Sequence, residues 1–476
     1  MKNIPAAALC VAALAGCAGM PSTDVDRRLG EETAQSVEEQ IGLVDDKALA
    51  DDVGAVGARV AAAVPNRRFE YRFAVVDQVE PNAFAAPGGY IYVSRGLLAL
   101  TRAEDELAGV LAHEIQHVER RHSVQQMQKE ARLGLLALPG VLAAGIVSSD
   151  LAALVATPIA AVGARYSRDQ EREADTLGQP IAAAAGYDPM GIVAILDRME
   201  RFIGTMTHER RAPSFFDSHP STPERVATLT QRGQALQASR MPAISPNGAA
   251  YAMRLDGLLF GQNAAEGVVR GTELLHPELD FRITFPKGWT LENARLALAA
   301  VAPGKDGVAA LGLYGKGEAK DLQRIADAFA AKLAKQYRQK PEHIGGTTAG
   351  GMPAHAVVVT DRSGKEPVHL YFLWIADRGR IFQMIGITPH SQRDLVKATA
   401  ESLRPLTEKE RASIKELRLR VVPAQAGEKL EAVNRRMKGV LEIPVLAALN
   451  GVDAAKSFGR GDPVKVVVRI PYVPKK

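Results

Sequence analysis

The segment LAHEIQHVER, residues 111–120, constrains the fold most, because it places two histidines four positions apart with a glutamate directly after the first. Residues i and i+4 point the same way on an α-helix, so His113 and His117 could bind one metal ion. Glu114 would then lie beside that ion, where its carboxylate can hold a water molecule and accept its proton. The alternative is a pair of surface histidines on an amphipathic helix.

A catalytic zinc ion needs a third protein ligand and an open fourth position. The two cysteines, Cys10 and Cys17, lie in the N-terminal signal-like segment, so the ligands must be histidines or carboxylates. The segment SRDQEREAD, residues 167–175, offers Glu171 and Asp175, again at i and i+4. The sequence therefore predicts that a second helix packs against the first and completes the site.

Four segments in order resemble the HtpX and CAAX-type-I prenyl protease family of zinc metalloendopeptidases, metallopeptidase family 48 of the gluzincin type. The resemblance covers residues 26–229. It implies an α-rich zincin domain with a small edge-strand sheet, one Zn²⁺ ion per chain, and cleavage of internal peptide bonds. The four segments are NAFAAPGGYIYVSRGLL (residues 82–98), HEIQH (113–117), YSRDQEREAD (166–175) and SHPSTPER (218–225).

Residue by residue, the resemblance assigns roles to both predicted helices. It implies that His113, His117 and Glu171 are the zinc ligands and that Glu114 is the general base. Asp175 becomes an acceptor that fixes a ligand imidazole from behind.

The last of the four segments adds two cationic candidates. His219 and Arg225 match the family's His-Pro and following Arg, which implies a place near the open side of the metal. There they could stabilise the oxyanion during peptide hydrolysis. Alternatively, His219 occupies the open metal position and holds the enzyme latent, or it only caps a helix while Arg225 forms a surface pair. His122 and Glu173 are interpreted as exposed, because neither lies on the metal-facing side of its helix.

The N-terminal sequence MKNIPAAALCVAALAGC predicts export from the cytoplasm. It has one early lysine, an apolar run too short to remain as a spanning helix, and then small residues. The last four letters, LAGC, resemble the lipobox of bacterial lipoproteins. This resemblance implies a signal peptide over residues 1–16, acylation of Cys17, and a lipid anchor on the periplasmic side of the outer membrane. A plain signal peptide cut nearby is the alternative.

The rest of the chain predicts an α+β multidomain protein. Its 476 residues suggest roughly three domains. A segment at FRITFPKGW resembles PsbP-like domains, and a strand–helix–helix–strand segment near the C-terminus resembles LysM modules, which implies peptidoglycan as a partner. The expected parts are a zinc-protease domain (17–241), a linker (242–276), a small α/β sandwich (277–406) and a LysM-like module (411–470).

Two further features bear on partners. Residues 133–147 and 151–164 are almost wholly apolar but short of the roughly 20 residues that a spanning helix needs, so they predict buried helices. A membrane-dipping hairpin or a substrate lid is the alternative. The 59 basic residues exceed the 54 acidic ones by only five and are scattered, so nucleic acid is not an expected partner.

Together these patterns predict a zinc metalloendopeptidase of the bacterial envelope that cleaves misfolded or misassembled envelope proteins. A scaffold or chaperone with a latent metal site is the alternative, although a structural zinc has no use for Glu114. GGYIYVS, residues 88–94, could receive an extended substrate peptide as an added strand, unless it is an interior strand with both edges paired.

Overall fold

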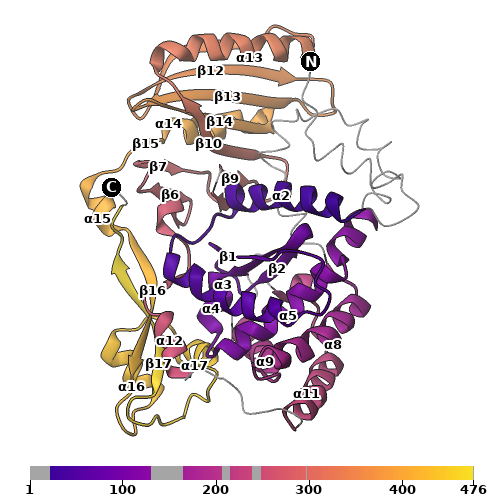
Figure 1. Cartoon of the computed structure of the whole chain (residues 1–476). Coiled ribbons are helices and arrows are strands. Elements are labelled where there is room, and N and C mark those ends of the chain that lie inside the picture. The colour runs from indigo at the N-terminus through magenta and orange to yellow at the C-terminus, as the bar shows by residue number, and fades with distance from the viewer. Residues whose placement is uncertain (1–21, 130–164, 206–214, 239–247, 296, 475–476) are drawn as a thin grey trace. The chain divides into compact units, whose positions relative to one another are not determined.

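The structure, a computed structural model, describes residues 22–129, 165–205, 215–238, 248–295 and 297–474. Cys17 and the whole of the apolar segment 133–164 lie outside the described residues. Within them, no helix combines the length and the apolar character that crossing a membrane requires. The described residues form two compact units: the first contains residues up to 261 together with Leu417–Ile470, and the second contains Gln262–Glu416 and residues 471–474 (Figure 1).

A sheet of three strands lies in the first unit. Its order is β1-β3-β2, with β3 parallel to β1 and antiparallel to β2. The hypothesis that residues 88–94 receive a substrate strand is therefore wrong, because β3 is paired on both sides. Alternation of apolar residues marks a strand but does not reveal its place in the sheet order. The strands are β1 (Arg72–Val76), β2 (Ala83–Ala86) and β3 (Tyr90–Ser94).

Helix α5 (Glu104–Glu119) is the central helix of this unit, and every one of its residues is buried. It packs against α3, α8, α9 and β2. Its apolar stripe, from Leu107 to Val118, belongs to the largest hydrophobic core cluster. The surrounding helices are α2 (Thr23–Gln40), α3 (Lys47–Ala62), α4 (Arg95–Leu100), α8 (Arg168–Ala184), α9 (Gly191–Thr205), α10 (Phe215–Ser218), α11 (Pro223–Ala238) and α12 (Gly248–Arg254).

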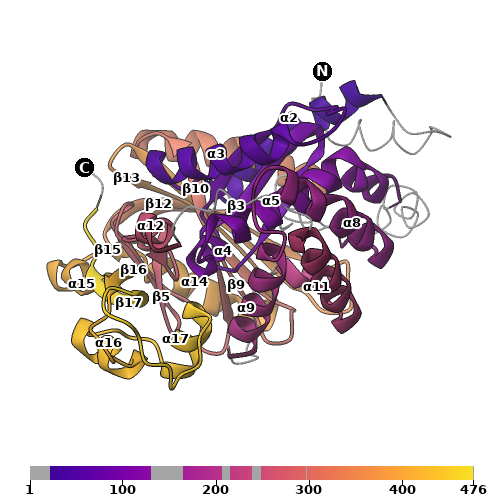
Figure 2. The ribbon, with the colours of Figure 1, turned by 60° about the horizontal axis from the view of Figure 1, so that its bottom comes forward.

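The C-terminal segment joins the same core. It has the order β16 (Lys415–Pro423), α16 (Leu430–Met437), α17 (Ile443–Asn450) and β17 (Pro463–Pro471). Figure 2 shows α17 beside α9, and the two helices are in contact. Buried side chains from all four of these elements belong to the cluster that surrounds α5.

The second unit is built on antiparallel strands. A seven-stranded sheet has the order β11-β12-β13-β14-β10-β9-β8, and a four-stranded sheet the order β15-β7-β6-β5. On β12 and β13, alternate side chains pack into two different clusters, one under α13 (Leu322–Tyr337) and one under α14 (Arg393–Glu401). The strands are β5 (Val268–Arg270), β6 (Glu273–His276), β7 (Phe281–Thr284), β8 (Thr290–Ala294), β9 (Ala297–Val301), β10 (Val308–Lys316), β11 (Glu342–Ala349), β12 (Met352–Asp361), β13 (Val368–Asp377), β14 (Arg380–Pro389) and β15 (Arg404–Pro405).

The expected linker, residues 242–276, is folded over its described part. It contains α12, β5, β6 and β4 (Leu259–Phe260), which pairs with β16. Pro and Gly near residue 245 indicated a loop, but the following residues bury Leu274 and Leu275 in two separate clusters. Short strands like these carry too few residues for a clear periodic pattern.

Candidate metal centre

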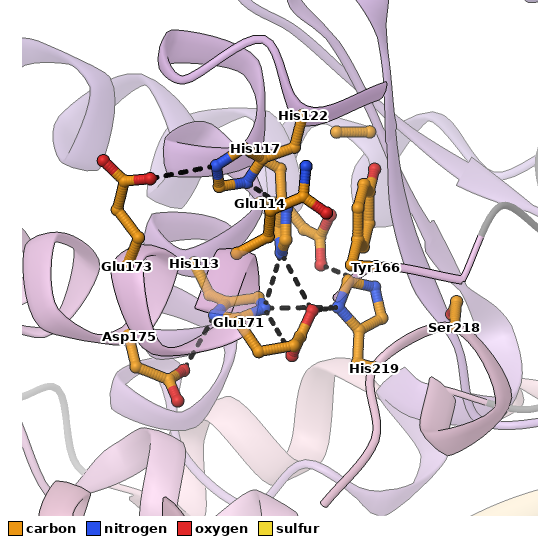
Figure 3. Close-up of polar contacts among 12 residues, drawn as sticks. His113, Glu114, His117, His122, Tyr166, Glu171, Glu173, Asp175, Ser218 and His219 are labelled. Atoms are coloured by element: carbon orange, nitrogen blue, oxygen red, sulfur yellow. Dashed lines mark hydrogen bonds and ion pairs between the residues drawn. The ribbon is translucent and has the colours of Figure 1, made fainter. Parts of the chain in front are cut away.

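Two helices and one loop bring four metal-binding side chains together (Figure 3). Helix α5 supplies His113 and His117 on adjacent turns, α8 supplies Glu171, and the residue after α10 is His219. Helix α8 approaches α5 closely at Gly178, where a Cβ would lie 2.9 Å from the carbonyl oxygen of Ala112. That glycine lets the carboxylate face of α8 reach the histidine face of α5.

The ligand atoms have the spacing of a tetrahedral zinc site. Zn–N and Zn–O bonds of about 2.0–2.1 Å place tetrahedral ligand atoms about 3.3 Å apart. His117 Nε2 lies 3.0 Å from His113 Nε2 and 3.3 Å from Glu171 Oε1. His219 Nδ1 lies 3.3 Å from His113 Nε2 and 2.9 Å from Glu171 Oε1. The buried imidazoles of His113 and His117 and the buried Glu171 carboxylate therefore fit a zinc ion, and the His219 imidazole lies within ligand spacing as well.

Glu114 has a different environment from the four ligand residues. Its side chain is fully buried, and neither carboxylate oxygen has a hydrogen-bond partner in the protein. The nearest cationic candidate is His219, whose Nε2 lies 3.4 Å from Glu114 Oε1. A buried carboxylate without donors is costly. The unpaired Glu114 carboxylate therefore indicates a group that interacts with a molecule bound in the site.

Residues 47–233 match the model of the family described as Peptidase family M48. This segment therefore resembles the metallopeptidase domains of that family. The family and the donor set together imply a zinc ion, as the sequence predicted.

Curated relatives agree with this assignment. The chain is 25% identical over 219 residues to the beta-barrel assembly-enhancing protease of Escherichia coli K12, covering 44% of each chain. It is 32% identical over 153 residues to the metalloprotease YcaL of the same strain, covering 32% of this chain and 58% of YcaL. Similarity to the mitochondrial metalloendopeptidase OMA1 of Schizosaccharomyces pombe is 28% over 218 residues, covering 44% of this chain and 61% of OMA1. The chain thus spans about half the length of these relatives.

Behind the four clustered side chains, Asp175 and Arg225 form a buried network. Asp175 Oδ1 lies 2.9 Å from Nδ1 of His113, the nitrogen that points away from the other ligands. Arg225 donates to both oxygens of Asp175, at 2.6 and 3.0 Å, and its third nitrogen lies 2.6 Å from Glu171 Oε2. The guanidinium is thus engaged with two carboxylates, an arrangement that orients a ligand histidine and a ligand carboxylate at once.

His117, the other α5 histidine of the cluster, has neighbours that the sequence did not reveal. The prediction that His122 is exposed is wrong: it is 1% exposed, and its Nδ1 lies 2.9 Å from Nδ1 of His117. The Tyr166 ring stacks on the His117 ring with a centroid distance of 3.9 Å. Tyr166 also shares a hydrogen bond with Ser123, whose hydroxyl donates to the Ala85 carbonyl of β2.

The segment that carries His219 is tied to both sides of the site. The Phe215 amide donates to the Pro81 carbonyl just before β2, and the Tyr166 amide donates to the Ser218 carbonyl. The Phe215 ring stacks on the His219 ring at 4.3 Å. These contacts hold the His219 imidazole inside the ligand cluster.

Burial and charge shift the pKa values of the clustered side chains. Burial holds the pKa of His117 well below its usual value, which keeps the ring in the neutral form that binds a metal. Burial alone would raise the pKa of Glu171, but His219 and His113 hold it well below the usual range. Burial raises the pKa of Glu114, and the neighbouring His219 and His113 only partly offset this.

Proposed function

We propose that this protein is a zinc-dependent endopeptidase of the bacterial cell envelope. The observation that carries the proposal is the Glu114 carboxylate, fully buried and without a protein partner beside a cluster of zinc-binding side chains. A zinc ion that only stabilises a fold gains nothing from an unpaired carboxylate next to it, because that carboxylate costs folding free energy. A hydrolytic site requires such a group as the general base.

Each residue of the site has a part in the proposed hydrolysis. A bound zinc ion supplies Lewis acidity, which lowers the pKa of water to about 7 and polarises a carbonyl. Glu114 takes the proton of the attacking water and passes it to the leaving amine. His113, His117 and Glu171 hold the ion, while Asp175 and Arg225 fix the orientation of His113 and Glu171.

His219 is proposed as a fourth ligand that keeps the site latent. Its Nδ1 lies within ligand spacing of both His113 and Glu171. Four protein ligands close a zinc site, whereas catalytic sites keep one position open. Segment 215–219 would therefore have to move before a substrate could bind. In the alternative, His219 is not a ligand and stabilises the oxyanion.

The proposed substrates are unfolded or misassembled envelope proteins, and the proposed location is the periplasmic face of the outer membrane, with a lipid anchor at Cys17. Support comes from the LAGC segment and from the similarity to a beta-barrel assembly-enhancing protease. Peptidoglycan binding by the LysM-like segment is a separate proposal, which a pull-down on purified murein tests.

The decisive experiment compares cleavage of casein or of an unfolded outer-membrane protein by protein lacking residues 1–16 and by its Glu114→Gln variant. We expect the variant to keep its zinc and to lose at least about 100-fold in rate, the usual contribution of a general base. His113→Ala should lose the zinc itself. Equal, slow cleavage by wild type and Glu114→Gln would instead favour a scaffold or chaperone with a latent metal site.

A further inference from the structure

A chain of two hydrogen bonds runs from the His117 ring to the surface of the first unit. His122 Nδ1 lies 2.9 Å from His117 Nδ1, and His122 Nε2 lies 3.2 Å from Glu173 Oε2 (Figure 3). The Glu173 side chain is 45% exposed and also pairs with Arg120 at 3.2 Å. One carboxylate near the solvent is thus connected through a buried imidazole to a metal-ligand histidine.

The direction of these hydrogen bonds follows from the metal site. His117 Nε2 faces the cluster, so its lone pair is needed for the ion and its Nδ1 must carry the proton. His117 therefore donates from Nδ1, and His122 Nδ1 must accept. The remaining His122 proton is then on Nε2, which donates to Glu173. Each nitrogen has one defined role, and no ring needs to carry a charge.

A break in the helix makes this contact possible. In a continuous helix, a residue five positions after His117 would lie on another face. Here α5 ends at Glu119, and Arg121 adopts a left-handed backbone with φ 58° before residues 122–129 begin a new helical turn. Arg121 is held in place by Asp26 of α2, with Nε to Oδ2 at 2.7 Å. The chain therefore turns back and places His122 behind His117.

We infer that His122 is a positioning residue of the zinc site, which orients the His117 ring by accepting its Nδ1 proton and is itself oriented by Glu173. The inference rests on the proposed zinc site. The two α5 ligands then differ in the group that orients each ring: the Asp175 carboxylate lies behind His113, and the His122 imidazole lies behind His117. Loss of such a partner typically costs 10–100-fold in metal affinity.

The test measures the Zn²⁺ dissociation constant by chelator competition. We expect His122→Phe, which keeps a ring but removes the acceptor, to weaken zinc binding by about 10–100-fold. His122→Asn, which restores an acceptor oxygen near the Nδ1 position, should recover most of the loss, and Glu173→Ala should cause a smaller loss than His122→Phe. The matched control is His343→Phe, because His343 of β11 also contacts a second histidine, His355, at 3.2 Å but lies in the second unit.

A second readout does not depend on activity. In Co²⁺-substituted protein, the shifted imidazole N–H resonance of His117 should exchange with D₂O faster in His122→Phe than in wild type. If His122→Phe does not fold, the zinc affinity of Glu173→Ala and the exchange rate of the His117 resonance in that variant test the inference instead. Equal zinc affinities in wild type, His122→Phe and Glu173→Ala would overturn the inference, while the peptidase proposal would stand. Equal losses of zinc affinity in His122→Phe and His122→Asn would also overturn it, because they would assign the effect to packing. A wild type that binds no zinc would overturn both.

Discussion

At the scale of single residues, zinc binding depends on both ring nitrogens of His113 and His117: the one that faces the cluster and the one that faces away from it. Asp175 lies 2.9 Å behind His113 and is held by two bonds from Arg225, so the orientation of one ligand depends on a second carboxylate and a guanidinium. An imidazole whose outer proton has a fixed acceptor keeps its ring plane and its tautomer. Zinc affinity is therefore sensitive to residues that never touch the ion.

Asp175→Asn tests this point. The amide removes the negative charge beside His113 and weakens the pair with Arg225, so we expect zinc affinity to fall by about 10–100-fold. Asp169→Asn on the same helix is the control, because the Asp169 side chain is 90% exposed and should leave zinc binding unchanged. Zinc titration against a chelator measures both, and equal affinities in the two variants would contradict the predicted role.

His219→Ala tests the proposed latency. Removal of the imidazole opens the fourth position, so we expect faster cleavage of an unfolded protein together with weaker zinc binding. The measurement is the initial rate per bound zinc. A loss of about 100-fold in rate with zinc fully bound would show instead that the histidine stabilises the oxyanion.

At the scale of elements, the site depends on how closely α8 approaches α5. Gly178 has no Cβ, and the space it leaves is filled by backbone atoms of Ala112 and His113. Helix α8 also begins at a fixed residue, because Ser167 and Gln170 form a capping box. Together, this start and the close packing set the rotation that turns Glu171 and Asp175 toward the histidines.

Gly178→Ala should therefore weaken both the fold and the site. The new methyl group would lie 2.9 Å from a backbone oxygen, and we expect a loss of about 1–3 kcal/mol in stability together with weaker zinc binding. Gly204→Ala in α9 is the matched control, since no atom lies within 4 Å of its added Cβ. There, alanine should stabilise the helix by up to about 1 kcal/mol. Thermal unfolding of the two variants checks both signs.

The sequence predicted the local part of the site and missed what depends on breaks in regular structure. Helical spacing alone placed His113, Glu114 and His117 on one helix and proposed Glu171 from a second. His122 was misplaced because its contact depends on the left-handed backbone of Arg121. Strand order likewise depends on pairing between distant residues, so the central position of β3 could not be read from its alternation.

At the scale of the whole molecule, residues 417–470 belong to the first unit, although residues 262–416 of the second unit separate them in sequence from the rest of the first. Lys465 shows how tightly they are joined. Its buried Nζ donates to the backbone carbonyls of Ala99, at 2.6 Å, and Thr101, at the end of α4. Burial, with a contribution from Arg198, holds the pKa of Lys465 well below its usual value.

The depressed pKa of Lys465 allows the packing of residues 417–470 against α4 to be tested by varying pH. Between the folded pKa and the ordinary lysine value of about 10.4, the unfolded chain binds one more proton than the folded protein. The stability of wild type should therefore rise with pH across that window, relative to Lys465→Met, in which the titration is absent. Unfolding midpoints of both proteins, recorded as pH increases, check the sign. A constant difference between them would contradict the burial of this amine.

The return of the chain to its first unit also sets the order of events during biosynthesis. While only the first 416 residues have emerged, the core around α5 lacks the apolar side chains that β16, α16, α17 and β17 contribute. Domains generally fold as units, so α5 reaches its final packing only after that later stretch has been made. If the protein is the endopeptidase proposed above, this order of assembly would keep it from cutting its neighbours while its own synthesis is unfinished.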